Sequence, residues 1–379
     1  MSKPLSISSS DTANSDTAKS GFGALKFAVR CALFVLLFVL VAELFFRFVI
    51  PARELAFTTQ DPQFMVLHYD RDAAASGLAT SGRFAQQRSR WHVNNYGWNS
   101  AVDYRPASER DKPAAVIIGD SYIDGFYVNW RDHVASRLQA VSGDRLEVYS
   151  LGVSGSSLAQ QINVARYAKH YLSPDIYIFM ITSNDVEESL AAKSNNPYRL
   201  RLEVQKGEIT EIAPRTYTPS RIRRLARYSA LVRYLTLNAN FSPGRRAPPA
   251  EPEAESGSET PLQPVVSYIF QRLREELPDA TLVFMTDGNR KALYEMFPER
   301  PPSIDDQAYV EQAAAEVGAY SLNLNDAFFE NYRAHGERLN YVHDFHWNPR
   351  ANAVAADALY ELLSAESRSG RVPLELPRP

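Results

Sequence analysis

Hydrophobic and polar positions first form one long apolar block near the start of the chain. Residues from Phe27 to Ile50 are almost all apolar, and the run from Cys31 to Ala42 carries no charge. A helix of this length spans the hydrocarbon core of a bilayer. The pattern therefore predicts one transmembrane helix over residues 25–50. The polar residues 1–24 before it lack the apolar side chains needed to fold, and we expect a disordered cytoplasmic tail there.

Basic residues around this block predict its orientation. Three of them precede or open the block and two close or follow it: Lys19, Lys26, Arg30, Arg47 and Arg53. Because basic residues favour the cytoplasmic side, the remainder of the chain is expected outside the cytoplasm, in the periplasm. A cleaved signal peptide and a buried helix are the alternatives. The sequences near Ala42 and Ala52 fit a cleavage site poorly, which favours an uncleaved anchor.

Beyond the block, short apolar runs alternate with amphipathic segments. Four continuous apolar runs, each followed by a polar or glycine-containing turn, predict buried strands: 114–118, 146–151, 176–181 and 281–285. Residues 319–323 are a candidate fifth strand. Apolar residues recur at helical spacing after the second run and again behind the pair Asn348-Pro349, which suits a helix start. The pattern therefore predicts strands that are separated by helices.

This alternation indicates an α/β fold with a parallel sheet covered by helices on both faces, in a flavodoxin-like three-layer arrangement. We expect a single such domain over residues 111–366, after a lead-in segment (51–110) and before a short tail (367–379). Ligands of open α/β sheets bind at the carboxyl ends of the strands. Residues that follow the strands are therefore the first candidates for chemistry.

Residues 187–263 interrupt the alternation and are predicted to be an insertion. They begin with a hairpin that turns at Lys206-Gly207, continue with a basic helix, and end in a Pro-, Ala- and Glu-rich stretch (243–263) that is expected to be a disordered linker. The basic helix contains Arg221, Arg223, Arg224 and Arg227. These arginines are candidates for contact with a membrane or a glycan, and a solvated helical face is the alternative.

Composition narrows the class of protein. The chain has 379 residues with 41 basic and 44 acidic side chains, a net charge of −3, which argues against nucleic-acid binding. Its single cysteine, Cys31, excludes an intrachain disulfide and a Cys-rich zinc site. Because Cys31 lies in the predicted membrane helix, the exported part has no thiol, and a nucleophile there has to be a hydroxyl.

Polar residues at the predicted strand ends suggest such a nucleophile. Ser121 follows the first strand directly after Gly119-Asp120, Gly155 follows the second strand, and Asn184 follows the third. Asp344 and His346 stand two positions apart just before the last helix. A serine hydroxyl needs a base within hydrogen-bond reach, and His346 is the histidine placed to serve.

These residues resemble the blocks of the SGNH hydrolase superfamily, the GDSL-type esterases, in the family's order. The blocks are Gly119-Asp120-Ser121, the Gly155 loop, Asn184-Asp185 and Asp344-x-His346, and the resemblance covers roughly residues 91–363. It implies Ser121 as nucleophile, His346 as base and Asp344 as the acid that orients it. It also implies an oxyanion hole formed by the backbone N–H groups of Ser121 and Gly155 and the side-chain amide of Asn184.

The acid spacing departs from the family's pattern. Most members place the acid three residues before the histidine, where this chain has His343. The spacing of two, followed by Trp347, is similar to the branch that O-acetylates exopolysaccharides and cell walls. The alternative role for this block is a metal site formed by His343, Asp344 and His346. No further ligand motif in the sequence supports such a site.

The sequence therefore predicts a membrane-anchored serine esterase or O-acyltransferase that acts on O-acyl groups, with O-acetyl groups of a polysaccharide or cell-wall glycan as the favoured substrate. We expect no cofactor and no metal. Two alternatives remain: a catalytically inactive binding or assembly protein for a glycan at the membrane, and a lipase or lysophospholipase.

Overall fold

The computed structural model describes residues 11–182, 184–239, 262–302, 305–342 and 344–370. Most of the expected linker, residues 243–261, lies outside these ranges. Residues 1–10 of the expected N-terminal tail and residues 371–379 of the C-terminal tail also lie outside them.

A five-stranded parallel sheet forms the centre of the structure. Its strands lie in the order β11-β10-β7-β5-β6. In chain order they are β5 (Ala114–Gly119), β6 (Glu147–Gly152), β7 (Ile176–Ile181), β10 (Thr281–Thr286) and β11 (Tyr320–Asn323). All five predicted strands are confirmed. Strand β6 lies on one side of β5 and β7 lies on the other, so the order in which strands are added to the sheet reverses between β5 and β7. Open α/β sheets form their sites at such a switch point.

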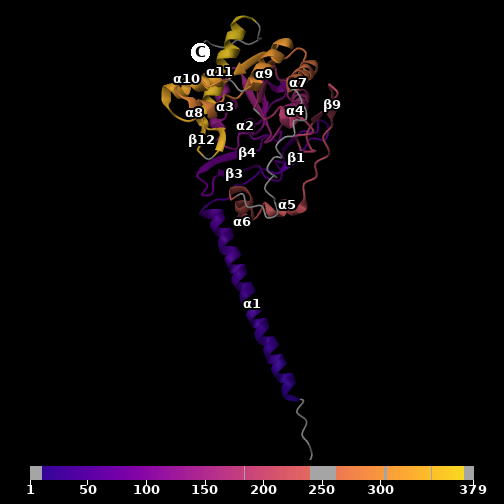
Figure 1. The fold of residues 1–379 in the computed structure, drawn as a ribbon, viewed down its shortest axis with the longest axis vertical. Coiled ribbons are helices and arrows are strands. Elements are labelled where there is room, and N and C mark those ends of the chain that lie inside the picture. The colour runs from indigo at the N-terminus through magenta and orange to yellow at the C-terminus, as the bar shows by residue number, and fades with distance from the viewer. Residues whose placement is uncertain (1–10, 183, 240–261, 303–304, 343, 371–379) are drawn as a thin grey trace, which may run out of the picture.

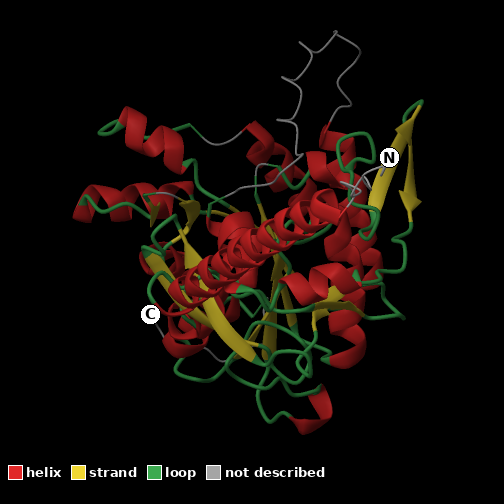
Figure 2. Ribbon diagram, turned by 90° about the horizontal axis from the view of Figure 1, so that it is seen from below, coloured by secondary structure: helices red, strands yellow, loops and turns green. Residues whose placement is uncertain are grey.

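Helices cover both faces of this sheet (Figures 1 and 2). One face packs on α4 (Leu158–Tyr171), α7 (Leu262–Glu276) and α9 (Asp305–Glu316). The other packs on α3 (Val134–Val141), α8 (Arg290–Met296), α10 (Asn325–His335) and α11 (Pro349–Arg368). Alternate residues of each strand serve the two cores: Tyr177 and Phe179 face the first, Ile176 and Ile178 the second. The α/β three-layer prediction is confirmed.

The lead-in segment and the insertion add small elements around this unit. Two antiparallel pairs precede the sheet: β1 (Thr58–Gln60) with β2 (Leu67–Tyr69), and β3 (Ser76–Ser81) with β4 (Gln87–His92). The predicted hairpin is confirmed as β8 (Arg201–Gln205) and β9 (Glu208–Ile212). Lys206 and Gly207 both have positive φ, 53° and 86°, as a tight two-residue hairpin turn requires. The insertion continues as α5 (Arg221–Ala226), α6 (Ala230–Arg233) and a π-helical turn, η4 (Tyr234–Asn238).

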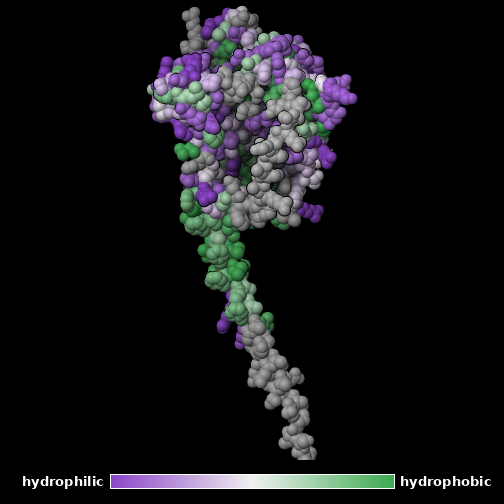
Figure 3. Space-filling view, viewed as in Figure 1, coloured by the Kyte–Doolittle hydropathy of each residue, from purple (hydrophilic) through white to green (hydrophobic). Residues whose placement is uncertain are grey.

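A long N-terminal helix, α1 (Asp11–Phe48), projects from the domain (Figure 1). Its segment Leu25–Phe48 is long and apolar enough to cross a membrane, and its side chains are largely exposed (Figure 3). The helix begins at Asp11, inside the segment that we expected to be disordered through residue 24. Once a helix is nucleated, each added residue gains a hydrogen bond without a new nucleation cost, which accounts for the extension.

Candidate active site

Ser121 opens a short helix, α2 (Ser121–Asp124), directly after β5. The carboxylate of Asp120 accepts a hydrogen bond from the Tyr122 amide at 2.9 Å and caps this helix. Asp120 therefore caps α2, and the Ser121 hydroxyl contacts His346 instead. The end of β6 comes close to this turn: a Cβ on Gly152 would lie 2.0 Å from the Asp124 amide nitrogen. Glycine at 152 thus allows the two strand ends to approach each other.

His346 and Asp344 lie on β13 (Asp344–Trp347), which pairs with β12 (Asn340–Tyr341) just before α11. His346 Nε2 lies 2.7 Å from Ser121 Oγ. On the other edge of the ring, His346 Nδ1 is hydrogen-bonded to the Asp344 carboxylate, and the His346 amide donates to the same Oδ1 at 3.0 Å. The three residues that the sequence singled out therefore form a continuous hydrogen-bonded chain, in which Ser121 and His346 are 225 residues apart along the sequence.

The environment of Asp344 favours its ionised form. Burial alone would raise the pKa of Asp344, but the hydrogen bonds and the charge of His346 outweigh burial and lower it. Ser81, the last residue of β3, also donates to the second carboxylate oxygen at 3.4 Å. An acid two residues before the histidine can thus hold the imidazole, because residues two apart on the strand β13 point to the same side and the Asp344 carboxylate meets Nδ1 there.

Two aromatic side chains flank the imidazole. The Tyr127 ring stacks on His346 with centroids 3.7 Å apart and planes 10° apart, and the Tyr122 ring lies 5.0 Å away. The Arg53 guanidinium lies 5.2 Å from the centroid of the Tyr127 ring. Arg53 belongs to the lead-in segment just after α1. A residue near the predicted anchor therefore contacts Tyr127, which stacks on the candidate base His346. No sequence motif marks Tyr127 or Arg53, so the sequence did not predict that they belong to the site.

Arg290, the first residue of α8, ties the histidine strand to the nucleophile turn. Its side chain is buried and donates to the Phe345 carbonyl at 2.5 Å, to the Tyr122 hydroxyl at 2.8 Å and to the Asp287 carboxylate at 2.6 Å. Asp287 also accepts from the Trp347 indole at 3.0 Å. This pair therefore contacts the residues on both sides of His346, and sequence analysis missed its role as well.

The predicted oxyanion-hole residues lie on loops that leave the same edge of the sheet as Ser121. Gly155 is exposed and has a φ of 72°, which glycine adopts without strain. The Arg199 guanidinium supports its loop: Arg199 donates to the Ser154 carbonyl at 2.6 Å, and a Cβ on Gly155 would lie 3.4 Å from Arg199 Nη1. Asn184 is exposed, and its amide donates to Glu188 at 2.8 Å.

Buried carboxyl groups lie beneath these loops. Asp124 accepts hydrogen bonds from Tyr69 at 2.9 and 2.8 Å and from the amide and hydroxyl of Ser154 at 3.1 and 2.6 Å. Burial raises the pKa of Asp124 to about 6, and burial also raises the pKa of Asp120 to about 6. Burial raises the pKa of Asp185 well above its usual value. Asp124 thus links the lead-in segment, the nucleophile turn and the Gly155 loop.

The other candidates lie elsewhere. Arg221 and Arg224 are exposed on α5, and Arg227 donates to the Ala56 carbonyl at 3.1 Å with its guanidinium 5.1 Å from the Phe57 ring. The side chain of Arg223 lies outside the described part of the chain, and so does His343, which the alternative metal site would need.

Comparison with known proteins adds a family match. The model of the family described as GDSL-like lipase/acylhydrolase matches residues 116–359. A comparison with curated proteins found no match.

Several solved structures are similar at low identity. A two-domain esterase active on acetylated mannans has 9% identity and a TM-score of 0.39, and the match covers 71% of this chain and 52% of that one. A catalytic mutant of an acetylxylan esterase from Geobacillus stearothermophilus has 16% identity and a TM-score of 0.36, with 65% and 92% covered. A member of the lipolytic G-D-S-L family from Veillonella parvula has 13% identity and a TM-score of 0.36, with 66% and 98% covered.

Proposed function

Because the chain belongs to the GDSL-like lipase/acylhydrolase family of SGNH-type esterases, we propose that it is a serine esterase or O-acyltransferase with Ser121, His346 and Asp344 as its catalytic triad. The observation that carries the proposal is the 2.7 Å distance between His346 Nε2 and Ser121 Oγ. At this distance the imidazole can take the hydroxyl proton as the oxygen attacks. The same distance favours catalysis over a binding protein that has kept only the fold.

The reaction would proceed through an acyl-enzyme. Ser121 Oγ attacks the ester carbonyl carbon while its proton moves to His346 Nε2, and the paired Asp344 carboxylate stabilises the imidazolium. The developing oxyanion would be bound by the amides of Ser121 and Gly155 and by Asn184. When the tetrahedral intermediate collapses, the alcohol leaves with the proton from His346. Water or a sugar hydroxyl then attacks the acyl carbon while its proton moves to His346, the bond between this carbon and Ser121 Oγ breaks, and His346 returns the proton to Oγ.

The acceptor decides between hydrolysis and transfer. Water as acceptor gives an esterase, and a sugar hydroxyl gives an O-acyltransferase. The Asp344-x-His346-Trp347 sequence, which is similar to the O-acetylating branch, supports O-acetyl groups of a polysaccharide or cell-wall glycan as the substrate class.

A second candidate substrate is an ester with a longer acyl chain. Val342 and Phe345, which precede and follow Asp344 in the sequence, are 78% and 67% exposed. Exposed large apolar side chains beside a triad favour contact with an apolar group of the substrate. This candidate corresponds to the lipase or lysophospholipase alternative.

Turnover of p-nitrophenyl esters by the detergent-solubilised full chain tests the proposal. We expect release of p-nitrophenol from the acetate ester, abolished in Ser121→Ala and in His346→Ala, and labelling of Ser121 by a fluorophosphonate probe. Full turnover in Ser121→Ala would exclude this mechanism. A chain-length series separates the two substrate classes, and an added glycan acceptor separates transfer from hydrolysis.

The anchor is proposed to remain attached and to place the domain outside the cytoplasm. The last turns of α1 are integrated in the folded domain: Glu43 accepts hydrogen bonds from Ser229 and from two amides of α6, and Phe46 stacks on Tyr234 with centroids 3.8 Å apart. Cleavage after α1 would remove these contacts, which favours an uncleaved helix. A periplasmic reporter fused after Pro379 tests the orientation, and activity of a cytoplasmic reporter there would reverse it.

A further inference from the structure

The insertion helices α5 and α6 lie at the base of the domain, and α6 lies beside the end of α1 (Figure 1). Glu43 of α1 holds the start of α6: its carboxylate accepts from Ser229 Oγ at 2.8 Å, from the Ala230 amide at 2.8 Å and from the Leu231 amide at 3.0 Å. Arg47, one turn further along α1, pairs with Glu43 and donates to the Tyr228 carbonyl at 2.9 Å. The base of the domain is therefore fixed to the helix at the level where its apolar segment ends.

Large apolar side chains are exposed at this base. On the insertion helices they are Leu225 (72% exposed), Tyr228 (63%), Val232 (37%) and Leu235 (37%). At the end of α1, Phe48 and Val49 are 74% and 61% exposed. Such a set is unusual on a surface that only water covers, and here α6 packs against the end of the apolar helix α1. Tyrosine is also a typical residue of the interface between hydrocarbon and head groups.

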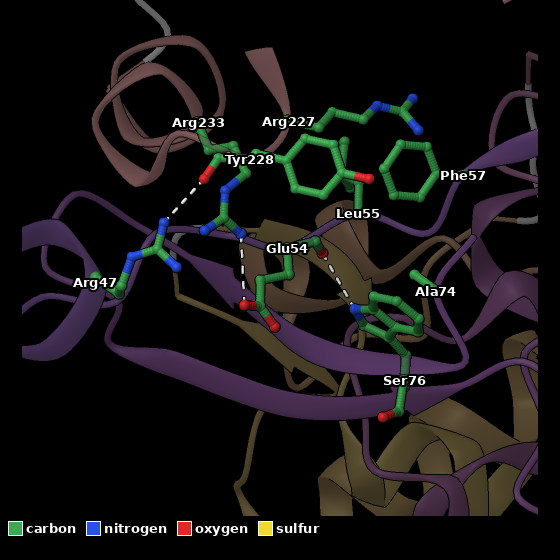
Figure 4. Close-up of a pocket in the computed structure, with 10 residues that line it drawn as sticks. Arg47, Glu54, Leu55, Phe57, Ala74, Ser76, Arg227, Tyr228 and Arg233 are labelled. Carbon is green, nitrogen blue, oxygen red and sulfur yellow. Dashed lines mark hydrogen bonds and ion pairs between the residues drawn. The ribbon is translucent and has the colours of Figure 1, made fainter. Parts of the chain in front are cut away.

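Positive charge lies next to this apolar set. A pocket of about 180 Å³ opens between the end of α1, the lead-in segment and α5–α6, and three arginines and one glutamate line it: Arg47, Arg227, Arg233 and Glu54. Figure 4 shows Arg227 beside Phe57, Arg47 bonded to the Tyr228 carbonyl, and Arg233 paired with Glu54. Arg221 and Arg224 of α5 are exposed nearby. Basic residues beside an apolar face favour anionic lipid head groups over neutral ones.

From these contacts we propose that α5, α6 and η4 form a membrane-docking surface, which seats the base of the domain on anionic phospholipid head groups. The proposal rests on α1 spanning the membrane. Leu225, Tyr228, Val232 and Leu235 would enter the interface, while the exposed Arg221 and Arg224 reach the phosphates. The hydrogen bonds between Glu43 and the start of α6 then fix the tilt of the domain, so that the catalytic site stays at a constant height above the bilayer. A glycan or a protein would not require the surface to lie level with the end of an apolar helix.

The single cysteine makes a depth measurement straightforward. In the full chain with Cys31→Ser, a nitroxide spin label is attached at Leu225→Cys or Val232→Cys, with Gln205→Cys of the exposed β8–β9 hairpin as the matched control. The protein is reconstituted in vesicles of phosphatidylcholine with or without phosphatidylglycerol. Power saturation then compares collisions of the label with oxygen, which concentrates in the bilayer, and with a water-soluble nickel chelate.

We expect a severalfold higher oxygen-to-nickel ratio at positions 225 and 232 than at 205, and a further increase when phosphatidylglycerol is present. Replacing Arg221 and Arg224 with glutamine should abolish the phosphatidylglycerol effect. Equal ratios at all three positions would overturn docking and leave a glycan or protein as the occupant. A chain that does not float with the vesicles would overturn both the anchor and the docking. Ester turnover of the same samples, measured separately, reports on the proposed catalysis.

Discussion

The phenol ring of Tyr127 stacks on the imidazole of His346, with 3.7 Å between centroids and 10° between planes. The imidazole has to present Nε2 to Ser121 while Nδ1 stays on Asp344. Rotation about the Cβ–Cγ bond would break both contacts. A flat neighbour restricts this rotation, so we assign Tyr127 the role of a positioning residue.

We therefore expect Tyr127→Leu to lower kcat by about 3- to 10-fold, the equivalent of an aromatic pair worth roughly 0.5–1.5 kcal/mol. KM should change little. Tyr127→Phe keeps the ring and loses only the hydroxyl, so it should retain most of the turnover. Steady-state kinetics on p-nitrophenyl acetate measure both variants. An unchanged kcat in Tyr127→Leu would show that Tyr127 does not position the imidazole.

Arg290 is expected to support both stability and turnover, and two substitutions separate these effects. Arg290→Met leaves the buried Asp287 carboxylate without its cation, and loss of one partner of a buried pair costs about 3–5 kcal/mol. The melting temperature should fall strongly. Arg290→Lys keeps the charge beside Asp287 but lacks the fork that reaches Phe345 and Tyr122 together.

For the lysine variant we expect a nearly normal melting temperature and a kcat lower by about tenfold, the equivalent of one hydrogen bond to a charged group. Differential scanning fluorimetry and ester turnover on the same preparation give the two values. A lysine variant that turns over like the wild type would show that Arg290 acts on stability alone.

The difference between what the sequence predicted and what it missed has a physical basis. Strands β5, β6 and β7 are buried along their whole length, so their apolar runs are continuous and visible, as in Ile176–Ile181. Ser121, Gly155 and Asn184 follow such runs directly. Asp344 and His346 stand before a capped helix, where Asn348 accepts from the Arg350 and Ala351 amides. Local pattern and motif were sufficient for these residues.

Residues that act through tertiary contacts left no local signal. Arg290 contacts Phe345 across 55 residues and Tyr122 across 168. Arg53 follows the anchor and reaches Tyr127 only because the lead-in segment folds beside the nucleophile turn. The sequence also did not predict that α1 begins at Asp11. The polar composition of the N-terminal segment shows that it has few apolar side chains to bury, but it does not show whether a following helix extends into it.

Asn184 tests the proposed oxyanion hole. Its side chain is exposed, so Asn184→Ala should leave the melting temperature nearly unchanged. If its amide binds the oxyanion, kcat should fall by about 10²- to 10³-fold, as for the loss of one donor in such a site. Glu188→Gln is the matched control, because it keeps a partner for the Asn184 amide at the same position. A loss of turnover in the control equal to that in Asn184→Ala would point to loop disorder instead.

Asp124 should make stability fall as the pH rises from 4 to 7. Burial raises its pKa from 3.8 to about 6, so the folded state binds its proton more tightly than the unfolded state. The resulting stabilisation, about 3 kcal/mol for this difference in pKa, is fully present below pH 4 and is lost as the pH rises through 6. Asp124→Asn remains neutral throughout and should lack this part of the pH dependence.

The measurement is the melting temperature of the detergent-solubilised full chain at several pH values. The difference between wild type and Asp124→Asn isolates this residue from other buried acids such as Asp120. Asp279→Asn, which removes one exposed carboxylate, controls for the change in net charge. Melting curves of wild type and Asp124→Asn that shift in parallel between pH 4 and 7 would mean that Asp124 folds already ionised, held by Tyr69 and Ser154.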